Sequence, residues 1–169
     1  MPGLFETVTD LQTGADCLRR RRYGVIYVAD GRLVHVRLRP FAKLAWLPEI
    51  LLGQRHHDRA PGDRCRLYYN QPLGHENFLA LRHVVSSRGG TLTSFREALR
   101  VLDEIARIKS TDALLCDVQN PRISSRLMTR WGWEPHCPKR WHRHYIKRFY
   151  GTYPATTAEH QHVEPVGVG

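Results

Sequence analysis

The sequence predicts an α/β fold built on a mixed, mostly antiparallel sheet. Three features predict it: a strand–helix–strand module between residues 78 and 118, a hairpin centred on Asp30-Gly31, and a last alternating strand near 141–148. A strand, a helix of about 15 residues and a second strand form a βαβ unit, whose two strands run parallel. The hairpin and the last strand add antiparallel neighbours to that pair.

Length and charge set the first limits on function. The chain has 169 residues, a length typical of one domain with one core. Residues 1–150 are expected to form that domain, and 151–169, which lack periodicity, are expected to form a flexible tail. A net charge of +10 with a pI near 10.0 indicates attraction to nucleic acid, an anionic membrane surface or a phosphorylated cofactor. Charge alone does not choose among these.

Cysteine spacing and the N-terminus indicate the cellular setting. The four cysteines are scattered without a CxxC pair, which favours reduced thiols over a disulfide framework. No basic and apolar leader and no membrane-spanning stretch is recognisable, so we expect a cytoplasmic protein without membrane association. The histidines and Cys137 of residues 136–144 are poorly spaced for zinc, so no metal is expected.

The first part of the chain contains one strong local pattern. Residues 4–18 carry apolar side chains at a spacing that predicts a short, glycine-interrupted helix. Asp30-Gly31 lies between two β-branched runs and predicts a two-residue hairpin turn, with His35 on its polar, surface side. Residues 41–52 predict two short helical pieces, because Pro48 interrupts them. Residues 65–70 predict another strand.

The central module is defined by periodicity and capping. Residues 78–85 are apolar on both faces, which predicts an interior strand with His83 half-buried. Ser94 and Glu97 form a capping box that predicts a helix start near Phe95. The helical period then directs four charged side chains toward water: Arg96, Arg100, Asp103 and Arg107. In the strand that follows, we expect Cys116 to be buried.

The next segment repeats the logic of a capped helix. Asn120 and Pro121 suit a helix cap and first turn, and Gly132 suits a left-handed exit. This segment, NPRISSRLMTRWGW, and the order of elements before it resemble the GNAT superfamily of acyl-CoA-dependent N-acyltransferases. The resemblance covers residues 77–138, and its matching positions are Asn120, Ser124, Leu127, Gly132 and Trp133. It implies a three-layer α+β sandwich with helices on both faces of the sheet.

The resemblance also implies a co-substrate site. In the family the two parallel strands part, the pantetheine arm of acetyl-CoA or another acyl-CoA enters the opening, and amides at the next helix start bind its pyrophosphate. The implied cofactor-binding residues are Val84, Val85, Arg88, Gly89, Gly90, Thr91 and Asn120. Gly89 and Gly90 are adjacent, whereas the family pattern separates its glycines. A plain glycine turn therefore explains the same residues equally well.

The catalytic residues depart further from the family pattern. Met128 occupies the position where many members carry a tyrosine that protonates the departing thiolate. Tyr145 or Tyr150 could replace it from the last strand. The candidate bases are Glu76 and His83, for which turn and core roles are the structural alternatives.

Two functions therefore stay open at this level. The first is an N-acyltransferase, acting by direct attack of an unknown amine on the thioester, with a homodimer as one assembly. The second is a non-catalytic GNAT-like module that contacts nucleic acid or another polyanion through Arg19–Arg22 and Lys139–Arg148, where basic and aromatic residues interleave. The sequence does not decide whether the chain is an enzyme.

Overall fold

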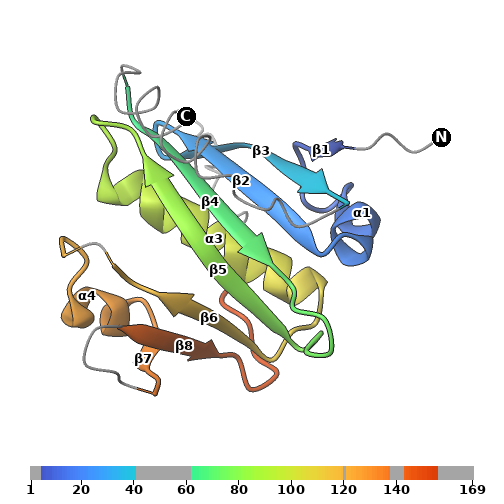
Figure 1. Ribbon diagram of the computed structural model, residues 1–169. Coiled ribbons are helices and arrows are strands. Elements are labelled where there is room, and N and C mark those ends of the chain that lie inside the picture. The colour runs from blue at the N-terminus through green and yellow to red at the C-terminus, as the bar shows by residue number, and fades with distance from the viewer. Residues whose placement is uncertain (1–4, 41–61, 120, 138–142, 156–169) are drawn as a thin grey trace, which may run out of the picture.

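The computed structural model describes residues 5–40, 62–119, 121–137 and 143–155. Within these ranges the strands are β1 (Glu6–Val8), β2 (Tyr23–Ala29), β3 (Arg32–Arg39), β4 (Arg64–Asn70), β5 (Phe78–Ser86), β6 (Ala113–Asp117), β7 (Glu134–Pro135) and β8 (His144–Arg148). They form one eight-stranded sheet in the order β1-β3-β2-β4-β5-β6-β8-β7, shown in Figure 1. Neighbours β5 and β6 run parallel, and the other described neighbours run antiparallel. The predicted α/β class with a mixed, mostly antiparallel sheet is confirmed.

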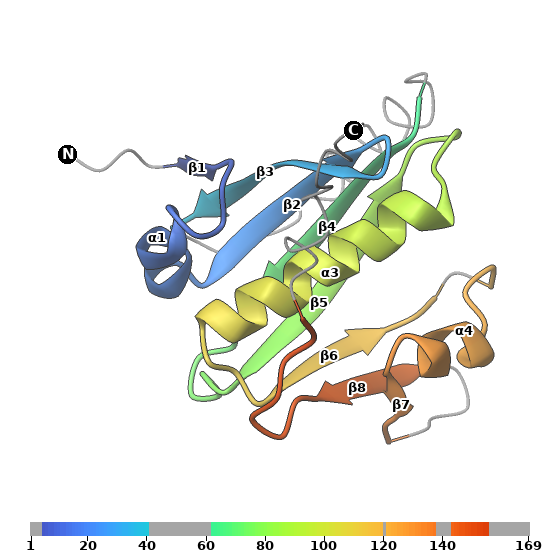
Figure 2. The same cartoon turned by 180° about the vertical axis from the view of Figure 1, so that it is seen from behind.

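The described helices α1 (Ala15–Arg20), α3 (Leu92–Ile108) and α4 (Ser125–Arg130) lie on one face of the sheet, as Figure 2 shows. Arg19 Nε of α1 donates to the Ile108 carbonyl at 3.1 Å. The Phe95 ring of α3 meets the Trp131 ring at the end of α4 with centroids 5.6 Å apart. The two short helical pieces predicted within 41–52 lie outside the described residues. The prediction of helices on both faces of the sheet is therefore confirmed for one face and stays a prediction for the other. No described helix is long and apolar enough to cross a membrane.

The single helix predicted over residues 4–18 is wrong. Residues 6–8 form β1 and pair with β3, and the helix begins only at Ala15. Between them the Asp10 carboxylate accepts hydrogen bonds from the amides of Gln12 at 2.8 Å and Thr13 at 3.1 Å. This side-chain turn competes with helical hydrogen bonding and redirects the chain.

The predicted hairpin is confirmed. Asp30 and Gly31 both have positive φ, at 51° and 71°, the conformation that a two-residue turn requires. In the register that results, Tyr27 lies opposite His35, and their rings stack with centroids 4.3 Å apart. His35 is half-buried because this contact covers part of its ring.

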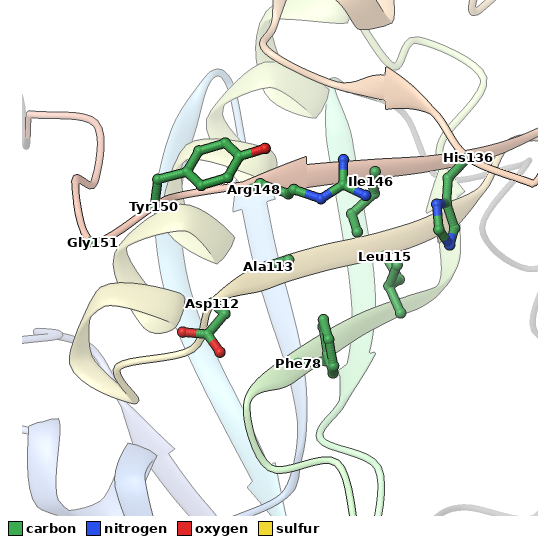
Figure 3. A pocket seen from close by; sticks show the side chains of 9 residues that line it. All are labelled: Phe78, Asp112, Ala113, Leu115, His136, Ile146, Arg148, Tyr150 and Gly151. Atoms are coloured by element: carbon green, nitrogen blue, oxygen red, sulfur yellow. The ribbon is translucent and has the colours of Figure 1, made fainter.

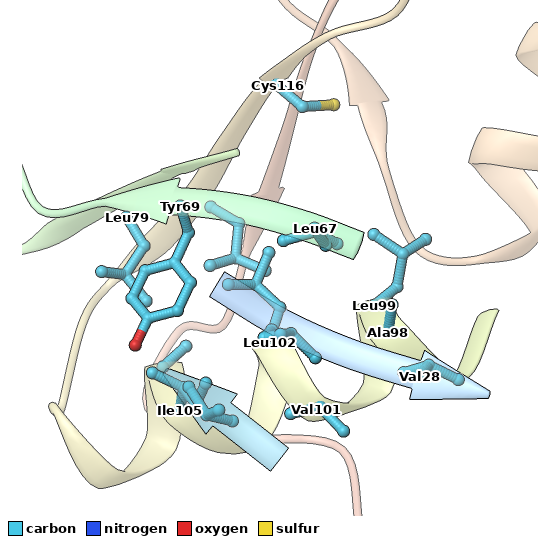
Figure 4. Packing of buried hydrophobic residues seen from close by; sticks show 14 of the residues in the cluster. Val28, Leu67, Tyr69, Leu79, Ala98, Leu99, Val101, Leu102, Ile105 and Cys116 are labelled. Carbon is cyan, nitrogen blue, oxygen red and sulfur yellow. The ribbon is translucent and has the colours of Figure 1, made fainter. Parts of the chain in front are cut away.

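Helix α3 covers the centre of the sheet and forms the core with it, as Figure 4 shows. Leu102 and Ile105 are fully buried, and truncating either to alanine typically costs about 2–5 kcal/mol. The helix is capped by Thr91, whose hydroxyl accepts from the Ser94 amide at 3.3 Å. It therefore begins at Leu92 rather than near Phe95.

Two other predictions about α3 need correction. Ser94 does not cap the helix, and its Oγ donates to Asp63 Oδ2 at 2.7 Å. Asp103 does not face water, since Lys147 Nζ of β8 donates to its Oδ2 at 2.6 Å. Asp63 directly precedes β4 and Lys147 lies in β8, and the helical period of α3 does not predict contacts with either.

The C-terminal elements complete the sheet beyond β6. Ser124 caps α4 by accepting from the Leu127 amide at 3.2 Å, so the cap lies after Asn120, which is outside the described residues. Gly132 has φ of 84°, which confirms the left-handed exit. The last strand is antiparallel to β6 as predicted. Tyr153 Oη donates to the Thr111 carbonyl at 2.7 Å, which attaches the first residues of the predicted tail to the domain. The rest of that tail, 156–169, lies outside the described residues.

Candidate functional site

The parallel strands β5 and β6 pair along only part of their length. Pairing begins at Phe78 with Ala113 and ends at Leu81 with Cys116. Beyond this point β5 continues to Ser86 against β4, while β6 ends at Asp117, and Figure 1 shows the two strands diverging.

A bulge in β5 coincides with this parting. Tyr68 lies opposite His83 and Tyr69 lies opposite Leu81, so Arg82 is the extra residue. A bulge bends its strand and increases the local twist. Beyond it, the backbone groups of β5 that point away from β4 face the side on which β6 is no longer paired. This is the kind of opening that the resemblance implies.

The loop between β5 and α3 is held tightly by the segment before β4. Ser87 is buried; its Oγ donates to the Gly62 carbonyl at 2.6 Å and accepts from the Arg64 amide at 3.0 Å. A Cβ on Gly89 would lie 3.0 Å from the Gly62 carbonyl oxygen. A Cβ on Gly90 would lie 2.9 Å from the Ser87 carbonyl oxygen. Close backbone packing therefore explains why glycine occupies both positions, which supports the glycine-turn interpretation.

A carboxylate already occupies the start of α3. Asp63 accepts from the Thr91 amide at 2.8 Å, from the Thr91 hydroxyl at 2.6 Å and from the Ser94 hydroxyl at 2.7 Å. Partial burial raises the pKa of Asp63, but these hydrogen bonds outweigh it and lower the pKa below its ordinary value. The position where the resemblance places a pyrophosphate therefore holds a negative side chain of this protein.

The predicted base Glu76 lies at the opposite end of β5 from this loop. Roughly 27 Å of extended strand separates the two ends, at about 3.3 Å per residue. Arg22 Nη2 donates to Glu76 Oε1 at 2.7 Å, and this hydrogen bond lowers the pKa of Glu76. The structure does not bring Glu76 together with the cofactor-binding candidates.

The predicted base His83 lies close to the parting of the strands. It is on the face of the sheet opposite α3, termed the distal face, which carries Tyr27, Arg37, Tyr68 and His83. Its ring is 6.1 Å from the Tyr68 ring, centroid to centroid. His83 is more exposed than predicted, yet partial desolvation by its neighbours lowers its pKa. A neutral imidazole able to accept a proton is therefore favoured at pH 7.

The predicted acid Tyr145 lies beside the last residue pair of the parallel strands. Tyr145 belongs to β8 and lies opposite Cys116 of β6. Its Oη is 2.6 Å from Ser125 Oγ in the first turn of α4. Met128, at the position of the family tyrosine, is 1% exposed and packs in the core. Met128 has no proton to give, and Tyr145 is the predicted acid that lies near the parting of the strands.

The remaining cofactor candidates fall into two groups. Val84 and Val85 are half-buried at the end of β5, and Arg88, Gly89, Gly90 and Thr91 are exposed in the loop that follows. Chain continuity thus brings these residues together. Asn120 lies outside the described residues.

The two basic segments predicted to contact polyanions are largely paired with carboxylates. Arg19 pairs with Asp16 at 2.8 Å, Arg21 with Glu6 at 3.2 Å and Arg22 with Glu76 at 2.7 Å. In the other segment Lys147 and Arg148 pair with Asp103 and Glu134 at 2.6 Å and 2.9 Å, and residues 138–142 lie outside the described part. These ion pairs reduce the charge available to a ligand.

A pocket of about 510 Å³ lies away from the parting, at the paired ends of β5, β6 and β8, as Figure 3 shows. Its lining residues are Phe78, Asp112, Ala113, Leu115, His136, Ile146, Arg148, Tyr150 and Gly151. Tyr150, the alternative acid, and Arg148 of the second basic segment line it, whereas Glu76, His83, Tyr145 and the described cofactor candidates do not. Within the described ranges, no three His, Cys, Asp or Glu residues come together as metal ligands.

Comparison with known proteins adds little to this geometry. No protein-family model matches the chain, and no curated protein matches it. Among solved structures, the crystal structure of nourseothricin acetyltransferase matches with 12% identity and a TM-score of 0.37, covering 86% of this chain and 99% of that chain. A TM-score and a sequence identity this low do not indicate a function for this chain.

Proposed function

We propose that this chain is an N-acyltransferase that takes its acyl group from acetyl-CoA or another acyl-CoA and transfers it to an amine. The observation that carries the proposal is the parting of the parallel strands after Leu81 and Cys116, at the bulge that contains Arg82. It leaves one edge of β5 with backbone donors and acceptors that an extended ligand can use.

The pantetheine arm of an acyl-CoA suits this edge. It is an extended chain with amide groups, which can pair with the backbone of β5 beyond Leu81 much as a neighbouring strand would. Arg88 is exposed at the end of this edge. Its amide and that of Gly89 form no hydrogen bond to any residue in the described ranges. In this proposal the diphosphate of the acyl-CoA contacts the Arg88 side chain and the amides of Arg88 and Gly89, because the Thr91 amide already donates its hydrogen bond to Asp63.

The reaction is a direct transfer between the two substrates. The amine nitrogen attacks the thioester carbonyl carbon, a C–N bond forms, and the backbone amides near Val84 and Val85 stabilise the oxyanion. The intermediate then expels the CoA thiolate as the C–S bond breaks. Tyr145 gives its proton to the sulfur, and His83 accepts the proton lost by the nitrogen. Glu76 takes no part because it lies at the far end of β5.

Isothermal titration calorimetry tests the binding step. A basic protein attracts any polyphosphate, so ADP serves as the control ligand that has a diphosphate but no pantetheine arm. We expect acetyl-CoA to bind at least about tenfold more tightly than ADP, since one or two added hydrogen bonds are worth about 1.4 kcal/mol. Equal affinities for the two ligands, or no binding of acetyl-CoA and of a longer acyl-CoA, would refute the proposal.

A further inference from the structure

The distal face of the sheet carries a concentration of positive charge that no carboxylate in its strands balances. The segments β2, β3, β4 and β5 contain no aspartate or glutamate. They contain six arginines: Arg32, Arg37, Arg39, Arg64, Arg66 and Arg82. None of these arginines forms an ion pair with a residue in the described ranges. In this they differ from Arg19, Arg21 and Arg22.

Strand register places several of these arginines on the distal face. Residues directly opposite each other in neighbouring strands share a face. Arg66 and His35 both lie opposite Tyr27, and Arg37 and Tyr68 both lie opposite Val25. The alternate positions, such as Ile26, Val36 and Leu67, are fully buried against α3. The arginines and the aromatic rings therefore point away from the core.

Three of the six guanidinium groups lie near an aromatic ring. Arg66 lies 5.1 Å from the Tyr27 ring centroid, Arg37 lies 5.5 Å from that of Phe5, and Arg39 lies 5.9 Å from that of Tyr68. This arrangement holds the charged groups over a flat surface while their N–H donors stay available. Arg39 Nε is buried without a hydrogen-bond partner in the described ranges, so a ligand contact of Arg39 would be made by its two terminal nitrogens.

The positive potential is also felt by the histidine between them. Burial lowers the pKa of His35, and the charges of Arg37 and Arg66 lower it further. Both arginines therefore lie close enough to act on the same point of the face. An anion bound there would interact with both.

We propose that the distal face binds single-stranded nucleic acid, with Arg37, Arg39 and Arg66 contacting phosphates and the Tyr27, Tyr68 and His83 rings contacting bases. Arg37 and Arg39 alternate along β3 and lie about 6.6 Å apart, and β4 lies two strand spacings, about 9.6 Å, from β3, so one extended strand of phosphates can run past all three guanidinium groups. An acidic protein would use the charges and leave the rings without a role, whereas single strands use both. A flat sheet face also does not enter the grooves of a duplex. The proposal shares His83 with the proposed acyl transfer, but its test measures binding and does not depend on catalysis.

Fluorescence anisotropy of a labelled oligo-dT of about 16 nucleotides tests this surface with the full chain. The Arg37→Ala/Arg66→Ala variant is expected to bind more weakly. Between about 50 and about 200 mM salt, the slope of log affinity against log salt should fall by about 1.4, or about 0.7 per lost phosphate contact. The control variant Arg96→Ala/Arg130→Ala removes the same charge from exposed positions of α3 and α4. It should bind as the wild type does.

Two outcomes would overturn the proposal. One is an equal loss of affinity and slope in both double variants, because binding would then follow net charge rather than this face. The other is that polyglutamate competes as well as unlabelled oligo-dT does, since the rings would then contribute nothing. Tyr68→Ala gives a separate readout: losing one stacked base should weaken oligo-dT binding roughly tenfold and leave thermal unfolding cooperative.

Discussion

The Asp63 carboxylate accepts a hydrogen bond from the Thr91 amide at 2.8 Å and thereby links the start of β4 to the start of α3. The two residues are 28 positions apart in the chain. The contact satisfies a free amide at the helix N-terminus and places a negative charge at the positive end of the helix dipole. It also places a carboxylate where an acyl-CoA diphosphate would otherwise bind.

Replacing Asp63 is expected to destabilise the fold. Asp63→Ala removes an acceptor of three hydrogen bonds at a helix start, and loss of such a cap costs about 1–2 kcal/mol. Urea denaturation should show this decrease in the free energy of unfolding. Asp16→Ala is the control, because Asp16 pairs with Arg19 on the exposed surface and should change stability by less than about 0.5 kcal/mol. Equal stability of Asp63→Ala and the wild type would contradict the proposed role.

The contribution of Asp63 should also depend on pH. Its pKa in the folded protein is below the ordinary value of 3.8, so folding is favoured by the ionised form. The stabilisation is fully present above the ordinary pKa and is lost as the pH falls through the lower, folded pKa. The difference in unfolding free energy between wild type and Asp63→Asn should therefore be constant from pH 5 to 7 and decrease below pH 4. A difference that grew on acidification would have the wrong sign.

Local patterns predicted the elements that depend on neighbours in sequence. The Asp30-Gly31 hairpin and the Gly132 exit follow from backbone conformations that few residues adopt. The buried face of α3 follows from its helical period. The spacing of Leu4, Val8 and Leu11 also fits a helix, but β1 pairs with β3 there, because the Asp10 turn and strand pairing outweigh a short periodic run.

The candidate site was predicted less completely because its decisive contacts are distant in sequence. The role of Asp63 was missed, because nothing near it in the sequence indicates a contact with the helix cap at Thr91. The bulge at Arg82 depends on the register of two strands, which a single strand does not encode. The absence of aspartate and glutamate from β2–β5 was visible in the sequence. Only the strand register shows that Arg37 and Arg66 share one face of the sheet.

The ion pair between Asp103 and Lys147 should be important for stability because both side chains are largely covered. Their exposed fractions are 12% and 14%, and the charged atoms are 2.6 Å apart. Lys147→Met would leave the Asp103 carboxylate buried without its partner, at a cost of about 3–5 kcal/mol. Chemical denaturation of the variant should show a loss of that size.

The double variant Asp103→Leu/Lys147→Met provides the control for this prediction. It removes both charges, so the penalty for an unpaired buried charge disappears, and stability should recover most of the loss. If the double variant is as unstable as the sum of its two single variants, the charges do not interact and the prediction is wrong.

Replacement of Tyr145 separates catalysis from packing in the proposed acyltransferase. Tyr145→Phe removes the hydroxyl that lies 2.6 Å from Ser125 Oγ and keeps the ring, which is 3% exposed. Loss of a general acid typically lowers kcat about 10²–10⁴-fold, whereas loss of one hydrogen bond costs stability only about 1 kcal/mol. Release of free CoA thiol with a panel of amines should therefore show a much lower kcat and little change in the KM for acetyl-CoA. The control Tyr150→Phe alters a side chain that is 79% exposed and should leave both constants unchanged. An unchanged kcat in Tyr145→Phe would contradict the proposed proton transfer, because the hydroxyl would then be irrelevant to the leaving thiolate.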